Sequence, residues 1–246
     1  MEKKKDIMNN TVELIDWYGG DKAIARAAWC STQIDVDSRT DEQIRHLIVN
    51  CLWNNGSGKP HRTPFERGLV EFNVTCEAAS HVHMIKHRHA SINGESARYK
   101  ELKEDRYYVP EDWDGINVNL DWDNAKDEHG FHLGVPFRCA DIKDWSDMLG
   151  WYTRLGNFLY HSALNDLETP LGRKRAKESA RFFKTYNSQV TLSVMMNMSC
   201  FENFQKLRND SAAQLEIREI SAMMLEQVAN IEGQPFKHTL EAWGYD

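Results

Sequence analysis

The densest group of side chains able to do chemistry lies between His81 and Tyr99. These 19 residues include four His, one Lys and two Arg, with Ser, Asn and Glu side chains among them. Arginine offers a planar fork of N–H donors and lysine a point charge, so the segment carries the donors of a site for phosphate or a nucleotide. A solvated helix end is the plainer interpretation of the same residues.

His83 and His87 are four residues apart, which is the spacing of metal ligands on one helical face. No Cys or carboxylate completes such a ligand set, and Lys86 and Arg88 would repel a bound cation. We therefore expect no metal site. The chemistry that fits this segment best is the binding of an anion.

Arg208 marks a second candidate site. It precedes a helix that we expect to begin at Asp210 or Ser211, where free backbone amides and the helix dipole favour an anion. Asn197 and Asn203 lie upstream and suit either a heteroaromatic ring or a helix cap. The chain has no G-x-G-x-x-G fingerprint, P-loop or G-x-S-x-G elbow, so the common nucleotide and serine-hydrolase motifs are not supported.

Apolar spacing and capping signals predict the elements that position these side chains. Helices are expected at 21–29, 44–52, 63–66, 78–88, 141–165, 170–184 and from 210 or 211 onward, and strands at 69–76 and 189–196. Residues 111–140 are acidic at their start and lack a helical repeat, so we expect a surface excursion there. Helices at both ends with a few strands between them indicate a single α+β domain over residues 1–246.

Several local signals set these boundaries. Asp21 is expected to cap the helix that it begins, and Thr40 with Gln43 forms a capping box. Thr169–Pro170 is expected to start a helix, after the helix at 141–165 whose apolar residues keep to one face. The expected core stripe of the final helix is Ile217, Ile220, Met224 and Val228.

Composition limits the class of protein. The 246 residues are 41% hydrophobic and 27% charged, which allows a sizeable core and excludes global disorder. The apolar runs are too short for a transmembrane helix or a secretory signal. A net charge of −7 argues against broad nucleic-acid binding, and five scattered Cys fit no disulfide framework. We expect a cytoplasmic protein with reduced thiols and no membrane or nucleic-acid partner.

Lys86-His87-Arg88, followed after seven residues by Ser96, resembles the signature Arg-His-Arg, seven residues, Ser of the flavin-dependent thymidylate synthases, the ThyX family. Further stretches resemble the family in the same order: Arg26–Ser31, His61–Glu66, Ser179–Arg181, and Asn197 through Asn203 to Leu207–Gln214. The resemblance runs from about residue 12 to residue 230 and leaves 111–140 unmatched.

The resemblance implies an α+β subunit with a mixed sheet flanked by helices, assembled as a homotetramer that holds FAD at subunit interfaces. It implies an enzyme that methylates dUMP to dTMP. Methylenetetrahydrofolate would supply the carbon, reduced FAD the hydride, and NADPH would reduce the flavin. Members of the family use no cysteine nucleophile.

The resemblance also assigns roles to single residues. Arg208 is expected to be catalytic, because it would bind the uracil and stabilise charge developing on the ring. The expected dUMP-binding residues are His83, Met84, Ile85, Lys86, Gly94, Glu95, Ser96, Ala97, Arg98, Arg181 and Arg208, with the phosphate held by Ser96, Arg98 and Arg181. The expected FAD-binding residues are Ser31, His61, Thr63, Glu66, Lys86, His87, Arg88, Asn93, Gly94, Asn197, Ser199 and Asn203.

Three departures from the family pattern leave alternatives open. Lys86 replaces the first Arg of the signature and loses its bidentate fork. His83 stands where the family has Gln, and Gly94-Glu95 shifts a carboxylate by one position. The alternatives are C5 methylation or hydroxymethylation of dUMP or dCMP on the same scaffold, and a noncatalytic nucleotide-binding protein.

Overall fold

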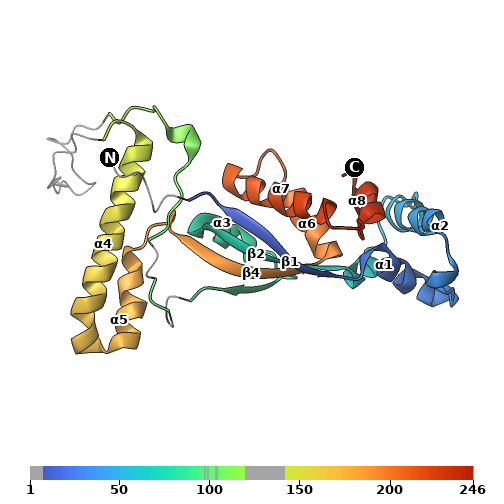
Figure 1. The fold of residues 1–246 in the computed structure, drawn as a ribbon. Helices are drawn as coiled ribbons and strands as arrows, with labels where there is room; N and C mark the ends of the chain where they lie inside the picture. The colour runs from blue at the N-terminus through green and yellow to red at the C-terminus, as the bar shows by residue number, and fades with distance from the viewer. Residues whose placement is uncertain (1–7, 97, 99, 103–104, 120–141, 246) are drawn as a thin grey trace. The chain divides into compact units, whose positions relative to one another are not determined.

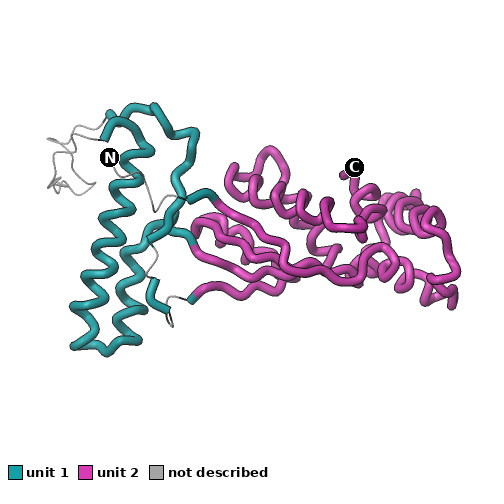
Figure 2. The backbone as a smooth tube through the Cα atoms, in the orientation of Figure 1, with its two compact units in different colours: residues 1–9, 96–189 teal, residues 10–95, 190–246 magenta. Residues whose placement is uncertain are grey.

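The computed structural model describes residues 8–96, 98, 100–102, 105–119 and 142–245 (Figure 1). The chain divides into two compact units, a smaller one of residues 1–9 and 96–189 and a larger one of residues 10–95 and 190–246 (Figure 2). Each unit has buried side chains of its own. The single-domain organisation expected from the sequence stays a prediction.

A four-stranded sheet forms the centre of the larger unit. Its strands are β1 (Thr11–Tyr18), β2 (Leu69–Glu77), β3 (Ser91–Gly94) and β4 (Gln189–Asn197), in the order β1-β2-β4-β3. β1 runs antiparallel to β2, and β3 runs antiparallel to β4. The α+β class is therefore confirmed. The expectation of a mixed sheet is wrong for these two pairings, because both place neighbouring strands in opposite directions.

The predicted strand at 69–76 is confirmed as β2. Its alternate residues Val70, Phe72, Val74 and Cys76 are each 0% exposed, as one face of a half-buried strand requires. The expected stripe on the last long helix is also buried, with Ile217, Ile220 and Met224 at 0% and Val228 at 1% exposure. Apolar side chains from both elements thus share the core of the larger unit.

The helices of the larger unit are α1 (Gly20–Trp29), α2 (Asp41–His46), α3 (Ala78–Met84), α6 (Met198–Arg208), α7 (Leu215–Ala229) and α8 (Lys237–Trp243), with a π-helix at Leu47–Trp53 and 3₁₀ turns at Cys30–Thr32, Val36–Ser38 and Thr63–Arg67. In this unit, α3 packs against β2 and α7 against β1, while α1, α2 and α8 lie toward one end of the sheet (Figure 1). The Thr40–Gln43 capping box is confirmed. So is the single turn that begins at Thr63 and ends at Gly68.

Two predicted helix boundaries in the larger unit are wrong. The helix expected at 78–88 ends at Met84, so the basic residues that follow lie in turns. The last long helix begins at Leu215 and not at Asp210 or Ser211. The reason is that the Asp210 carboxylate accepts from the backbone N–H of Ala212 and closes a local turn instead of capping a helix.

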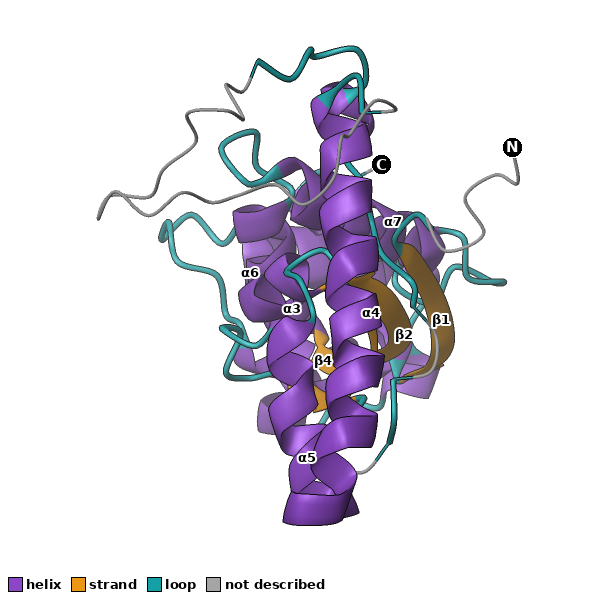
Figure 3. Ribbon diagram, turned by 90° about the vertical axis from the view of Figure 1, so that its left-hand side faces the viewer, coloured by secondary structure: helices purple, strands orange, loops and turns teal. Residues whose placement is uncertain are grey.

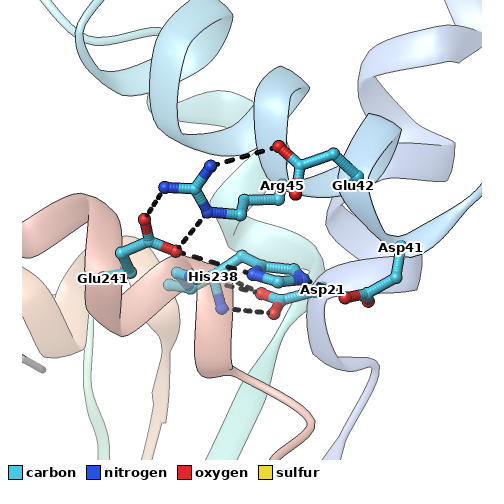
Figure 4. A network of polar contacts seen from close by, with 7 residues as sticks. Asp21, Asp41, Glu42, Arg45, His238 and Glu241 are labelled. Atoms are coloured by element: carbon cyan, nitrogen blue, oxygen red, sulfur yellow. Dashed lines mark hydrogen bonds and ion pairs between the residues drawn. The ribbon is translucent and has the colours of Figure 1, made fainter.

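Asp21 caps a helix other than its own. The structure shows no side-chain cap on α1, whose N-cap is Gly19. The Asp21 carboxylate instead accepts from the backbone N–H groups of His238 at 2.7 Å and Thr239 at 3.1 Å, at the start of α8. Figure 4 shows how this contact joins a network that includes Arg45 and Glu241. The predicted local cap is wrong, because two distant backbone donors take its place.

The smaller unit is built on a helical hairpin of α4 (Trp145–Leu171) and α5 (Arg173–Ala180), which lie side by side in Figures 1 and 3. A 3₁₀ turn at Arg181–Phe183 follows. The expected helix start at Thr169–Pro170 is wrong, since α4 continues through Pro170. Gly172, with φ of 78°, ends it.

The buried face of α4 differs from the predicted apolar face. Tyr152 and Phe158 are 56% and 66% exposed, while Gly150, Thr153 and Gly156 are buried. A glycine is needed at 156 because a Cβ there would lie 2.6 Å from the carbonyl oxygen of Phe183. Close backbone approach therefore decides which face is buried.

The remaining predictions concern the segment after residue 110, the cysteines and membrane spans. Residues 111–119 are exposed apart from the half-buried Val118, and a 3₁₀ turn forms at Glu111–Trp113. The rest of the expected excursion, 120–140, lies outside the described residues, as does Cys139.

Cys30 and Cys51 are exposed thiols, and Cys76 and Cys200 are buried thiols. In the described part of the chain, no helix has the length and apolar character to cross a membrane.

Candidate functional site

Arg208 is the last residue of α6, in the larger unit. The prediction that a helix N-terminus just after Arg208 favours an anion is therefore wrong. Arg208 stands at a helix C-terminus, where the dipole presents partial negative charge. Any anion or electron-rich ring near this residue must be held by the guanidinium group itself. Arginine is well suited to that role, because it stays charged and carries five N–H donors.

The Arg208 guanidinium is anchored by two residues of the segment at 81–99. Its Nε donates to Nε2 of His87 at 3.0 Å, and its Nη2 donates to the backbone carbonyl of His83 at 3.5 Å. The His83 ring lies 3.3 Å from the Gln214 amide oxygen. Arg208 is thus brought together with His87 and His83, which precede it by 121 and 125 residues. The ligand contacts expected of these residues stay predictions.

His87 is 7% exposed, and its ring meets Phe204 edge-on at a centroid distance of 4.9 Å. Burial lowers the pKa of His87 to about 4, and the charge of Arg208 and the neighbouring His83 act in the same direction. The ring is therefore neutral at neutral pH. A neutral ring leaves Nε2 free to accept from arginine.

The rest of the basic segment is mostly open to solvent. Ile85, Lys86 and Arg88 are exposed, whereas Met84 is 0% exposed and belongs to the core. Asn93 and Gly94 lie in β3, and the backbone N–H of Glu95 donates to the carbonyl of Thr191 at 2.9 Å. Lys86 and Arg88 thus present cationic groups on the surface of the larger unit.

A cavity of about 750 Å³ opens in the larger unit. It is lined by Tyr18, Ala23, Arg26, Ala27, Ala28, Cys30, Ser31, Leu52, His61, Thr63, Pro64 and Arg67. Three expected FAD-binding residues, Ser31, His61 and Thr63, are therefore brought together here. Arg26, Arg67 and Tyr18 also line the cavity, and no site role was predicted for them, although Arg26 stands in one of the matching stretches.

Other expected FAD-binding residues already have structural partners. The Asn197 side chain accepts from the backbone N–H of Cys200 at 2.8 Å and caps α6, which is the alternative that its sequence left open. Ser199 accepts from Nε of Arg62 at 3.2 Å. Glu66 and Asn203 are exposed. Their expected contacts with FAD stay predictions.

The residues expected to hold the dUMP phosphate belong to the smaller unit. Nε of Arg98 donates to a Glu178 carboxylate oxygen at 2.8 Å, and this bond lowers the pKa of Glu178. The Ser96 hydroxyl lies 3.4 Å from the backbone nitrogen of Arg98. Arg181, which is exposed, follows Glu178 by one helical turn at the end of α5. Ala97 lies outside the described residues.

Within the described ranges, no group of three or more His, Cys, Asp or Glu side chains is placed to hold a metal ion. His83 and His87 do not share a helical face, because α3 ends between them at Met84. The absence of a metal site stays an expectation for the whole chain.

An α+β fold, a cavity with arginine and hydroxyl groups in its lining, and an anchored guanidinium are features that suit the binding of anionic, nucleotide-like ligands. Comparison with protein families gives a more specific answer. The chain belongs to the family described as thymidylate synthase complementing protein, whose model matches residues 13–232. The family resemblance seen in the sequence is thereby confirmed.

Individual relatives agree with this assignment. A flavin-dependent thymidylate synthase of Anaplasma marginale is 26% identical over 217 residues, which cover 88% of this chain and 67% of the relative. One of Ehrlichia ruminantium is 27% identical and is covered to 66% of its length. One of Thermosipho africanus is 27% identical over 232 residues, covering 94% of this chain and 90% of the relative. The chain thus spans about two thirds of the first two relatives.

A solved structure shares the fold. A UMP/dUMP methylase, PolB, from Streptomyces cacaoi, in a crystal structure with 5-Br dUMP, superposes with a TM-score of 0.71. The two chains are 24% identical, and the match covers 97% of this chain and 96% of the other. At this identity the likeness establishes the fold.

Proposed function

We propose that this protein is a flavin-dependent thymidylate synthase, an enzyme that methylates dUMP to dTMP. The observation that carries the proposal is the family match over residues 13–232. Relatives named flavin-dependent thymidylate synthase, matched over most of this chain, support it. Neither these names nor the structural neighbour favours hydroxymethylation or a cytidine substrate.

The cavity fits a flavin nucleotide by its chemistry. Ala27, Leu52 and Pro64 offer apolar surface to an aromatic ring, and Arg26 and Arg67 offer positive charge to a diphosphate. Ser31, His61 and Thr63 would add hydrogen bonds, and Lys86, His87, Arg88 and Asn203 complete the proposed set. FAD, when bound and reduced, supplies the hydride for the reaction.

Two groups of basic residues would bind the nucleotide substrate. Arg98 and Arg181, with Ser96, would hold the phosphate, since guanidinium forks match phosphate oxygens. Arg208 would donate to a carbonyl oxygen of the uracil and stabilise negative charge that develops on the ring as C5 reacts. His83 and His87 fix the guanidinium for this task before the substrate arrives.

Folate, NADPH and a homotetramer also belong to the proposal. Methylenetetrahydrofolate would supply the carbon, and NADPH would reduce the flavin. Association is supported by the exposed aromatic residues of the smaller unit, where Phe158, Phe182 and Tyr186 are 66%, 79% and 72% exposed. Apolar surface of this kind is commonly covered by a partner.

The test is a spectrum followed by a product analysis. The protein, reconstituted with FAD, is expected to show a flavin absorption band that bleaches with NADPH under anaerobic conditions and shifts when dUMP is added. With methylenetetrahydrofolate, mass spectrometry should find dTMP. Conversion of dCMP alone, or failure to bind FAD, would contradict the proposal.

A further inference from the structure

The guanidinium of Arg208 is held from one side by α3 and the turn after it. Its Nε donates to His87 Nε2 at 3.0 Å, and its Nη2 reaches the His83 carbonyl. These bonds use two of the three guanidinium nitrogens. Among the described residues Nη1 has no hydrogen-bond partner, so it can donate to another acceptor.

The His87 Nε2 atom can accept this hydrogen bond in only one protonation and tautomeric state of the ring. Arginine is a donor with no lone pair, so Nε2 must be unprotonated and the single ring proton must sit on Nδ1. A protonated ring would place a second cation 3.0 Å from the guanidinium nitrogen. The bond thus requires a neutral imidazole.

The surroundings hold His87 in that state. Phe204, which is 0% exposed, stands one turn before Arg208 on α6 and meets the imidazole edge-on. The charged and titratable groups that face the ring are Arg208 from α6 and His83 from α3, and neither favours protonation. Burial, an aromatic neighbour and a cation all stabilise the neutral form.

We propose that His87 is a positioning residue, which accepts a hydrogen bond as a neutral imidazole and so fixes the Arg208 guanidinium for the pyrimidine base. The proposal rests on the proposed function for the identity of the substrate. In this role His87 acts through Arg208, and the role is separate from any direct contact between the His87 ring and the flavin. It also accounts for an uncharged side chain between the two cations Lys86 and Arg88, because only a neutral acceptor can serve here.

Three variants of His87 test the role. His87→Ala removes the acceptor, His87→Gln keeps a neutral acceptor, and His87→Lys puts a cation in its place. Loss of a hydrogen bond to a charged group predicts that His87→Ala raises the KM for dUMP by about tenfold to a hundredfold. His87→Gln should restore it to within about threefold, and His87→Lys should be at least as impaired as His87→Ala. His89→Ala, an exposed neighbour, is the matched control and should resemble the wild type.

A second measurement needs no turnover. ¹⁵N NMR of the imidazole should show His87 neutral, with its proton on Nδ1, at pH 6. Arg208→Gln should raise the pKa of His87, because the neighbouring cation is gone. Flavin content should match the wild type in the Arg208→Gln protein, and the His87 variants are assayed at saturating FAD because the ring is also a proposed flavin contact.

Two results would overturn the proposal: a His87→Gln protein that folds and binds FAD but is as impaired as His87→Ala, or a His87 that is protonated at pH 6 in the wild type. Failure of the proposed function looks different. In that case wild-type protein would make no dTMP, while the NMR titration would still report whether His87 and Arg208 are coupled.

Discussion

The carboxylate of Asp21, in α1, accepts hydrogen bonds from both the backbone nitrogen and the hydroxyl of Thr239, 218 residues further along the chain. Figure 4 shows Asp21 beside His238, whose backbone nitrogen donates to the same carboxylate at 2.7 Å. The His238 ring lies 3.0 Å from Asp41, and Arg45 pairs with Glu241. The start of the larger unit and its last helix are therefore tied by one buried acid.

The Asp21 carboxyl should make stability depend on pH. Burial raises its pKa from 3.8 to about 6, despite the hydrogen bonds that oppose the shift. Between pH 4 and 6 the folded state then binds more protons than the unfolded state, so this group's contribution to stability falls as pH rises, by up to about 3 kcal/mol. Urea unfolding of the wild type and Asp21→Asn should show their difference in unfolding free energy shrinking over this range. A pH-independent difference would contradict the assignment.

The Thr239 hydroxyl should contribute to the same contact. It is fully buried and donates to Asp21 at 2.6 Å. Thr239→Val keeps the shape but removes the donor, and we expect it to cost about 1.5–3 kcal/mol at pH 7, as for a hydrogen bond to a charged group. Thr239→Ser retains the hydroxyl and should lose clearly less. A Thr239→Val protein as stable as the wild type in urea unfolding at pH 7 would mean that this hydrogen bond contributes nothing to stability.

Local signals in the sequence predicted local structure well. The Thr40–Gln43 capping box, the turn begun by Thr63–Pro64 and the alternation of β2 each involve residues a few positions apart, and all three are found. Asp21 does not cap its own helix, because its donors come from α8. No residue near Asp21 in the sequence indicates this contact. β1, β3, α6 and α8 went unpredicted, although the alternation in 11–18 carries a strand signal.

The candidate site, too, could be predicted from the sequence only in part. Residue types and the spacing Lys86-His87-Arg88 to Ser96 were enough to indicate the family, which the comparison confirmed. The partner of Arg208 could not be found from spacing, since His87 is 121 residues away. The ring's neutral state depends on Phe204 and on burial, which only the folded chain provides.

Two glycines of α4 should respond in opposite ways to alanine. At Gly156 a Cβ would lie 2.6 Å from the Phe183 carbonyl oxygen, which belongs to the backbone. Gly156→Ala should therefore cost about 1–3 kcal/mol. At Gly150 the nearest atom is the flexible Nη1 of Arg154 at 3.2 Å, so Gly150→Ala should gain up to about 1 kcal/mol from helix propensity. Thermal unfolding of both variants compares them, and a tolerated Gly156→Ala would refute the close packing of this segment.

Two exposed cysteines provide a test of the proposed flavin cavity. Cys30 lines the cavity of about 750 Å³ that also contains Ser31, His61 and Thr63. Cys51 lines a separate cavity of about 450 Å³ beside Trp29 and Arg39. Both thiols are exposed, so both should react with N-ethylmaleimide in the protein without flavin.

FAD should protect Cys30 and leave Cys51 reactive, because only the first thiol shares a cavity with the expected flavin contacts. At FAD about tenfold above its Kd, mass action predicts that alkylation of Cys30 slows by about tenfold. Peptide mass spectrometry measures each thiol separately, so Cys51 is an internal control for general changes in reactivity. Protection of both thiols would indicate a change of the whole unit or association of subunits. If Cys30 reacts equally fast with and without bound FAD, the flavin does not occupy this cavity, and Ser31, His61 and Thr63 lose their assigned role.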